Sequence, residues 1–141
     1  MRERFPLPIP NGWFQLAYAD ELARSSVLPL RYFGKDLLLS RSEGGRPELV
    51  ERAKGQRLPC IERNRIVWGW HHAAGRAPEW ELPEVAEVSS EEWTPFERHR
   101  WTVRTHNQEI GENAVDRAHF RYVHGTAEVP ESELQLDGHV R

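Results

Sequence analysis

Residues 109–124 hold carboxylate, amide and imidazole side chains within one short segment: Glu109, Glu112, Asn113, Asp116, His119 and His124. Imidazole nitrogens and carboxylate oxygens are common protein ligands of transition metals. On an α-helix, Glu112, Asn113, Asp116 and His119 fall on one face about 100° wide, together with Phe120 and Val123. Because an amphipathic helix usually exposes its acidic residues to water, this mixed face indicates polar groups that are buried in the protein for a functional reason.

His124 does not belong to that face on an ideal helix. It follows His119 by five residues and so lies about 140° away from it. Both imidazoles reach one ion only if the helix ends or widens into a π-type turn near Tyr122, and Gly125 is a plausible terminator. The alternative is a solvated helix end, where imidazoles favour the negative pole of the helix dipole and Asp116 pairs with Arg117 or Arg121.

The order Glu112-Asn113-x-x-Asp116-x-x-His119-x-x-x-x-His124 resembles the mononuclear-iron motif of Rieske non-heme iron oxygenases. The resemblance is to the oxygenase subunit of the ketosteroid 9α-hydroxylase and cholesterol 7-desaturase branch. Other segments are similar to the family's entry into its Rieske domain, its first hairpin, the strand pair that closes that domain and the start of the catalytic domain: residues 5–14, 27–39, 61–71 and 93–139.

The resemblance implies an α+β fold and a role for each motif residue. Residues 1–72 would be a partial Rieske-type antiparallel β domain, and residues 86–141 the start of a catalytic domain with a helix and an antiparallel sheet. His119 and His124, with a distal carboxylate, would hold Fe(II). Asp116 would bridge His119 to a cluster-bound histidine of a neighbouring subunit in a homotrimer, and Asn113 would lie near the iron. The substrate would be a steroid or sterol, oxidised with O₂ and electrons from a ferredoxin or flavin reductase.

The chain departs from the family at the [2Fe–2S] cluster, which needs a Cys-x-His pair and a Cys-x-x-His pair. Cys60 is its one cysteine, and no histidine precedes His71. The cluster loops would lie between Gly45 and Gln56, and the distal acid would follow Arg141. We therefore interpret the chain as an internally deleted, C-terminally truncated oxygenase without cluster-binding residues, expected to bind Fe(II) poorly and to be inactive alone. The alternative is a non-catalytic remnant that acts as a binding or interaction module, so whether the chain is an enzyme stays open.

Composition excludes some classes of partner. With 19 basic and 22 acidic residues dispersed along 141 positions and a net charge of −3, nothing favours nucleic acid. The N-terminus lacks a secretory signal, and no apolar run approaches the roughly 18 residues of a membrane span. A single cysteine rules out an internal disulfide, so we expect the cytoplasm. Cys60 itself is typical of a small buried apolar residue.

Local patterns predict the elements around the motif. Strands are expected at 13–18 and 61–71, the latter as a pair, and a hairpin at 27–40 that turns at 34–36. Pro47 and Gly55 favour a short helix over 47–54. The alternative is that residues 47–54 only join the two sides of a deletion and have no tertiary partner. The Pro- and Gly-rich connector 72–85 is taken as the domain boundary. It should be followed by a strand at 94–105, a helix at about 106–123 and a strand at 134–140.

The deletion is expected to damage folding. Without cluster loops, Leu37, Leu38, Leu39 and Trp68 should lose their apolar cover. Phe120 and Val123 should have little to bury against, because later strands of the catalytic sheet are missing. The chain is therefore expected to aggregate or to be dynamic unless a partner supplies strands.

Overall fold

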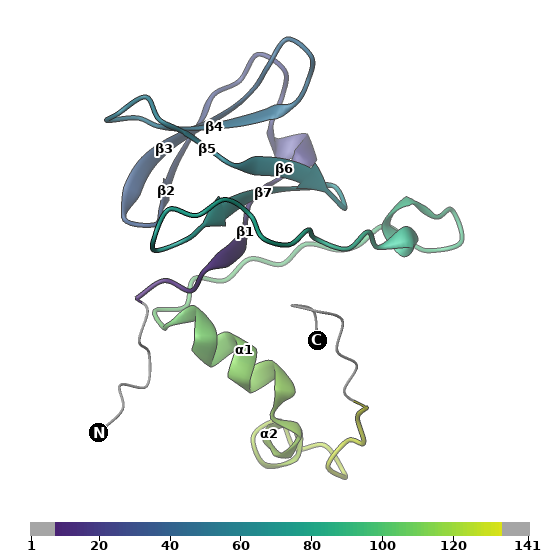
Figure 1. Ribbon diagram of the computed structural model, residues 1–141. Helices are drawn as coiled ribbons and strands as arrows, with labels where there is room; N and C mark the ends of the chain where they lie inside the picture. Colours follow the sequence, from purple (N-terminus) through teal and green to yellow (C-terminus); the bar gives the residue numbers. More distant parts are fainter. Residues whose placement is uncertain (1–7, 134–141) are drawn as a thin grey trace. The chain divides into compact units, whose positions relative to one another are not determined.

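The computed structural model describes residues 8–133, which fall into two compact units (Figure 1). Pro10–Arg100 form the first, and residues 101–133 belong to the second. The first contains two antiparallel sheets and the second two short helices, which confirms the α+β fold class. The domain limits at residues 72 and 86 stay a prediction. None of the helices in residues 8–133 is both long and apolar enough to cross a membrane.

The first sheet has the strand order β1-β7-β6, with β1 at Gly12–Tyr18, β7 at Ile66–His71 and β6 at Cys60–Arg63. Both pairs are antiparallel, so the strands predicted at 13–18 and 61–71 are confirmed. The register of β1 shifts between Gln15 and Ala17. Such a bulge lets two successive residues face the same side, and Leu16 and Ala17 are both buried.

The second sheet has the order β2-β3-β4-β5, also antiparallel. Its strands are β2 (Leu28–Tyr32), β3 (Lys35–Arg41), β4 (Pro47–Glu51) and β5 (Arg57–Leu58). A short 3₁₀ helix, η1 (Ala19–Glu21), follows β1, and a second, η2 (Ala86–Ser89), follows the connector. The predicted hairpin at 27–40 is confirmed as β2 and β3.

Each of two hairpins turns on a pair of residues with positive φ. Phe33 and Gly34 have φ of 55° and 70°, and Asn64 and Arg65 have 56° and 59°. Paired positive φ values define the tight turn that matches the right-handed twist of antiparallel strands. The first turn therefore begins one residue before the predicted position.

The core lies between the two sheets. Its buried members are Leu16, Ala17, Leu22, Leu37, Leu39, Leu49 and Val67. Leu37 and Leu39 are 1% and 0% exposed, so the expectation that they lose their cover is wrong. They alternate along β3 with the more exposed Asp36 and Leu38, as the period of two of a half-buried strand requires.

The predicted helix over 47–54 is also wrong, because this stretch forms β4 and a turn. All five residues of β4 pair with β3, and Leu49 and Glu51 point inward with 1% and 5% of their surface exposed. Gly55 has the positive φ of a helix-terminating glycine, but its amide donates to the Glu51 carbonyl at 2.8 Å inside the turn to β5. The segment has a tertiary partner, and pairing with it prevails over the local helix signals.

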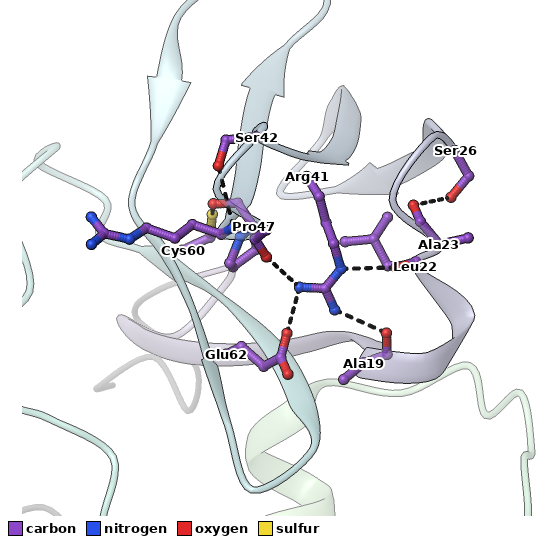
Figure 2. Close-up of polar contacts among 11 residues, drawn as sticks. Ala19, Leu22, Ala23, Ser26, Arg41, Ser42, Pro47, Cys60 and Glu62 are labelled. Carbon is purple, nitrogen blue, oxygen red and sulfur yellow. Dashed lines mark hydrogen bonds and ion pairs between the residues drawn. The ribbon is translucent and has the colours of Figure 1, made fainter.

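Arg41, at the end of β3, ties the two sheets together (Figure 2). Its guanidinium donates to the carbonyls of Leu22 (2.8 Å), Ala19 (3.0 Å) and Gly45 (2.7 Å). It also forms an ion pair of 2.7 Å with Glu62 on β6, and its side chain is only 12% exposed. One side chain thus connects η1, the β3–β4 turn and the first sheet.

Residues 94–105 are fully described and contain no strand, so that prediction is wrong. Side chains hold part of this segment instead. The Arg98 guanidinium donates to both carboxylate oxygens of Asp20 at 2.8 Å and lies 4.0 Å from the centre of the Tyr18 ring. Arg100 pairs with Glu21 at 2.9 Å. The hydrogen bonds from Arg98 lower the pKa of the Asp20 carboxyl.

Replacing Gly69 is expected to destabilise the first unit, because a side chain there has no room. A Cβ at Gly69 would lie 2.8 Å from Leu16 Cδ1 and 3.1 Å from Leu49 Cδ2. Overpacking of this kind costs about 1–3 kcal/mol, so Gly69→Val should lower the free energy of unfolding by that amount. Urea denaturation followed by tryptophan fluorescence measures the change. Gly44→Ala is the control, since its Cβ would meet only Ser42 Oγ, at 3.9 Å; equal effects of the two variants would refute this packing argument.

The second unit contains α1 (Asn107–Val115) and α2 (Arg117–Tyr122). The predicted continuous helix from 106 to 123 is therefore interrupted at Asp116. Phe120 and Val123 are 39% and 66% exposed, in line with the expectation that they have little to bury against. The strand predicted at 134–140 lies outside the described residues.

Candidate metal centre

Asp116 separates the two helices and begins the second one. Its backbone is extended, and its Oδ1 accepts hydrogen bonds from the amides of Ala118 (3.1 Å) and His119 (3.3 Å). Aspartate is among the preferred residues for this capping position because its carboxylate satisfies amides that the first turn leaves free. The capping carboxylate therefore fixes the backbone from which the His119 side chain projects.

The break changes the predicted arrangement of the motif. The single face of Glu112, Asn113, Asp116 and His119 requires one continuous helix, and Asp116 instead ends α1. Asn113 is exposed on α1, and Glu112 Oε1 accepts a hydrogen bond of 2.8 Å from Gln108 Nε2. The capping role of Asp116 was missed from the sequence, although an aspartate just before a helical segment is a known start signal.

The end of α2 widens in the way that the spacing of the histidines requires. The His119 carbonyl accepts from the amides of Val123 (2.8 Å) and His124 (3.4 Å), and the second bond spans five residues, as in a π-type turn. The Thr126 amide reaches back to the Phe120 carbonyl at 3.1 Å, and Gly125 has a φ of 71°. Glycine adopts this left-handed conformation without a steric penalty, which lets the chain turn back after His124.

The two imidazoles converge as a result. Nε2 of His119 lies 2.8 Å from Nε2 of His124, and the ring centres are 4.6 Å apart. Two imidazole nitrogens bound to one ion at about 2.1 Å and at right angles would be separated by about 3 Å. The observed 2.8 Å is a hydrogen-bonding distance between the two rings, and it is also close to the spacing of two adjacent coordination positions on a single metal ion. Phe120 flanks it, with its ring centre 6.0 Å from His119 and 6.2 Å from His124.

A third protein ligand is not present among residues 8–133, where no group of three histidine, cysteine, aspartate or glutamate side chains could hold a metal ion. The structure thus brings together His119 and His124, whereas Asp116 caps α2 and Asn113 is exposed on α1. The described part of the chain therefore offers one pair of neighbouring imidazoles, with no third potential ligand beside them.

Comparisons with known proteins cover the segment that holds this histidine pair. The sequence model of the 3-ketosteroid 9alpha-hydroxylase C-terminal domain matches residues 69–141, which include both histidines. The chain belongs to this family. Its membership confirms the resemblance to the ketosteroid 9α-hydroxylase and cholesterol 7-desaturase branch of Rieske oxygenases, a family of steroid- and sterol-oxidising enzymes.

Curated relatives of the hydroxylase family include a cholesterol 7-desaturase from Caenorhabditis elegans, 42% identical over 94 residues, or 67% of this chain and 21% of that protein. A Bombyx mori cholesterol 7-desaturase is 26% identical over 174 residues, or 90% of this chain and 38% of the relative. A 3-ketosteroid-9-alpha-monooxygenase oxygenase component from Rhodococcus rhodochrous is 32% identical over 90 residues, or 62% of this chain and 23% of the relative.

The chain thus spans between about a fifth and two fifths of these relatives. The Bombyx mori alignment covers 174 residues, more than the 141 of this chain, so that relative contains residues within the matched region that have no counterpart here.

Proposed function

We propose that this chain is an iron-binding component of a steroid- or sterol-oxidising Rieske-type oxygenase, in which His119 and His124 supply two ligands. The observation that carries the proposal is the 2.8 Å separation of the two Nε2 atoms, within the segment that matches the hydroxylase family. Iron held by two histidines and a carboxylate supplies open coordination positions at which O₂ is activated. The carboxylate would come from outside the described residues.

The remaining roles follow from the resemblance. Both amide bonds to Asp116 use Oδ1, so Oδ2 is available for the hydrogen bond toward a neighbouring subunit that the resemblance implies. Asn113 would approach the iron from α1. The substrate would be a steroid or sterol, electrons would come from a ferredoxin or flavin reductase, and the complete assembly would be a homotrimer. The cytoplasm is the proposed compartment.

A titration with Co(II), a spectroscopic substitute for Fe(II), tests the assignment on the full chain. We expect weak binding, because two imidazoles without an anionic third ligand leave most positions to water. Paramagnetic broadening should nevertheless select the ring protons of His119 and His124. His119→Ala and His124→Ala should each weaken binding by more than the roughly 10–100-fold that loss of an outer partner costs.

His99→Ala is the matched control, since the His99 side chain is 62% exposed and its Nε2 lies 3.6 Å from a carboxylate oxygen of Glu97. It should leave the titration unchanged. Binding that survives in both His119→Ala and His124→Ala would contradict the site. Tight stoichiometric binding that either variant abolishes would mean that Asp116 or Glu112 completes the ligand set.

A non-catalytic interaction module remains the second candidate. The observation in its favour is the set of exposed apolar side chains in the second unit, which includes Trp101, Val103, Ile110, Val115, Tyr122 and Val123. A chain that binds neither Co(II) nor Fe(II) at His119 and His124 would favour this candidate over the first.

A further inference from the structure

The residues of this chain do not fit the [2Fe–2S] cluster that gives the Rieske family its name. Such a cluster needs two thiolates and two imidazoles. The chain has one cysteine, and residues 8–133 contain no group of three potential metal-binding side chains. The question is then how the β unit is held together without a cluster.

Cys60 is engaged as a neutral thiol. Its Sγ donates to the Pro47 carbonyl at 3.2 Å, a contact that links β6 to the start of β4 (Figure 2). Burial raises the pKa of the Cys60 thiol to about 11. Iron binds thiolates, and an apolar setting that keeps the proton on sulfur opposes ligation.

The two histidines at the end of β7 also have protein partners. The His71 ring stacks on Phe33 at 4.8 Å between centres, and burial lowers the pKa of the imidazole. The nitrogens of His72 lie 3.0 Å from the Ala74 amide and 3.0 Å from Arg76 Nε. Neither imidazole is paired with a cysteine.

Residues 42–58 close the unit by ordinary backbone pairing. The Ser42 amide donates to the Arg46 carbonyl at 2.9 Å, which makes the turn that brings β4 beside β3. The Glu51 amide donates to the Gln56 carbonyl at 2.8 Å, which makes the turn into β5. Between the two turns, Leu49 is 1% exposed and reaches Gly69 on the other sheet.

The buried carboxylate of β4, at Glu51, also has partners. Glu51 is 5% exposed, and its carboxylate lies 2.9 Å from Lys35 Nζ and 3.6 Å from Lys54 Nζ. The hydrogen bond from Lys35 lowers the pKa of this carboxyl. Within the described residues, no buried side-chain nitrogen or oxygen lacks a hydrogen-bond partner, so none of these atoms is left over for a cofactor.

We propose that residues 10–100 fold as a metal-free β unit, in which Leu49 and the paired strand β4 complete the core without an iron–sulfur cluster. A unit without a cluster does not carry electrons. This inference is independent of the iron assignment at His119 and His124, because it concerns side chains of the first unit alone.

The test uses the full chain with His119→Ala and His124→Ala, so that mononuclear iron at that pair is not counted. The protein is treated anaerobically with ferrous iron and sulfide and then desalted. Iron, acid-labile sulfide and the urea midpoint are measured with and without a chelator. We expect no sulfide bound and the same midpoint under all conditions.

Variants in the same background locate the source of stability. Leu49→Ala should lower the folded-to-unfolded ratio at least about thirtyfold, whereas Val50→Ala, on the opposite face of β4, should have a much smaller effect. Cys60→Ser retains a donor to the Pro47 carbonyl and should change the ratio less than about fivefold. Two results would overturn the proposal. One is equal amounts of bound iron and sulfide that are lost in Cys60→Ser. The other is a urea midpoint that falls when the chelator is added.

Discussion

Replacing Arg41 with methionine is expected to lower the free energy of unfolding of the β unit by about 3 kcal/mol. Methionine retains a flexible apolar stem but removes every donor. Three carbonyls, at Ala19, Leu22 and Gly45, and the Glu62 carboxylate would lose the guanidinium, and the Ala19 carbonyl would keep only the long bond of 3.4 Å from the Leu22 amide. A group left unsatisfied in a largely dry site costs about 1–3 kcal/mol, so partial access of water to these four still leaves a large loss.

Arg46→Met is the matched control for Arg41, because Arg46 is exposed on the adjacent turn. It should change stability by less than about 0.5 kcal/mol. Arg41→Lys should recover only part of the loss, since one ammonium group cannot reproduce the planar fork of the guanidinium. Urea denaturation provides all three values. Equal stability of Arg41→Met and Arg46→Met would show that the hydrogen bonds of Arg41 contribute nothing net.

The hairpins could be predicted because their signals are local. Strand-forming residues lie on both sides of Gly34 and of Asn64, which adopt positive φ more readily than most residues, and the two turns form at Phe33-Gly34 and Asn64-Arg65. The positive φ of Phe33 and of Arg65 has no such local signal. From the sequence, His119 and His124 could be predicted to converge only on the condition that the helix widens or ends near Tyr122. Gly125 supplies the turn that meets it.

The errors occur where a distant partner decides the local structure. Pro47 and Gly55 carry helix signals, but Leu49 is buried against the other sheet and β4 pairs with β3, so the extended form prevails. In contrast, residues 94–105 alternate as a strand should, yet they pair with no strand of the described chain; Arg98 fixes the segment through Asp20 and Tyr18. An alternating sequence does not form a strand where no sheet edge is available for it to pair with.

Truncating Leu39 to alanine is the most direct test of whether the shortened unit has a real core. The Leu39 side chain is 0% exposed, lies in the second strand of the four-stranded sheet and belongs to the cluster that includes Leu16, Leu49 and Val67. Loss of a fully buried leucine costs about 2–5 kcal/mol, from the lost transfer free energy and from the cavity left behind. Since a typical domain has only about 5–15 kcal/mol of stability, Leu39→Ala should shift the urea midpoint strongly or prevent folding.

Leu38→Ala distinguishes a packed core from general hydrophobic collapse. Leu38 is the neighbouring residue of the same strand, points to the opposite face and is only partly buried. In a packed two-sheet core, the Leu38 variant should lose much less stability than the Leu39 variant, and amide exchange should remain slow in β3 and β7. A collapsed, fluctuating chain does not distinguish the two faces of a strand. Similar losses in both variants, together with rapid exchange throughout residues 10–100, would therefore show that the shortened unit has no specific core.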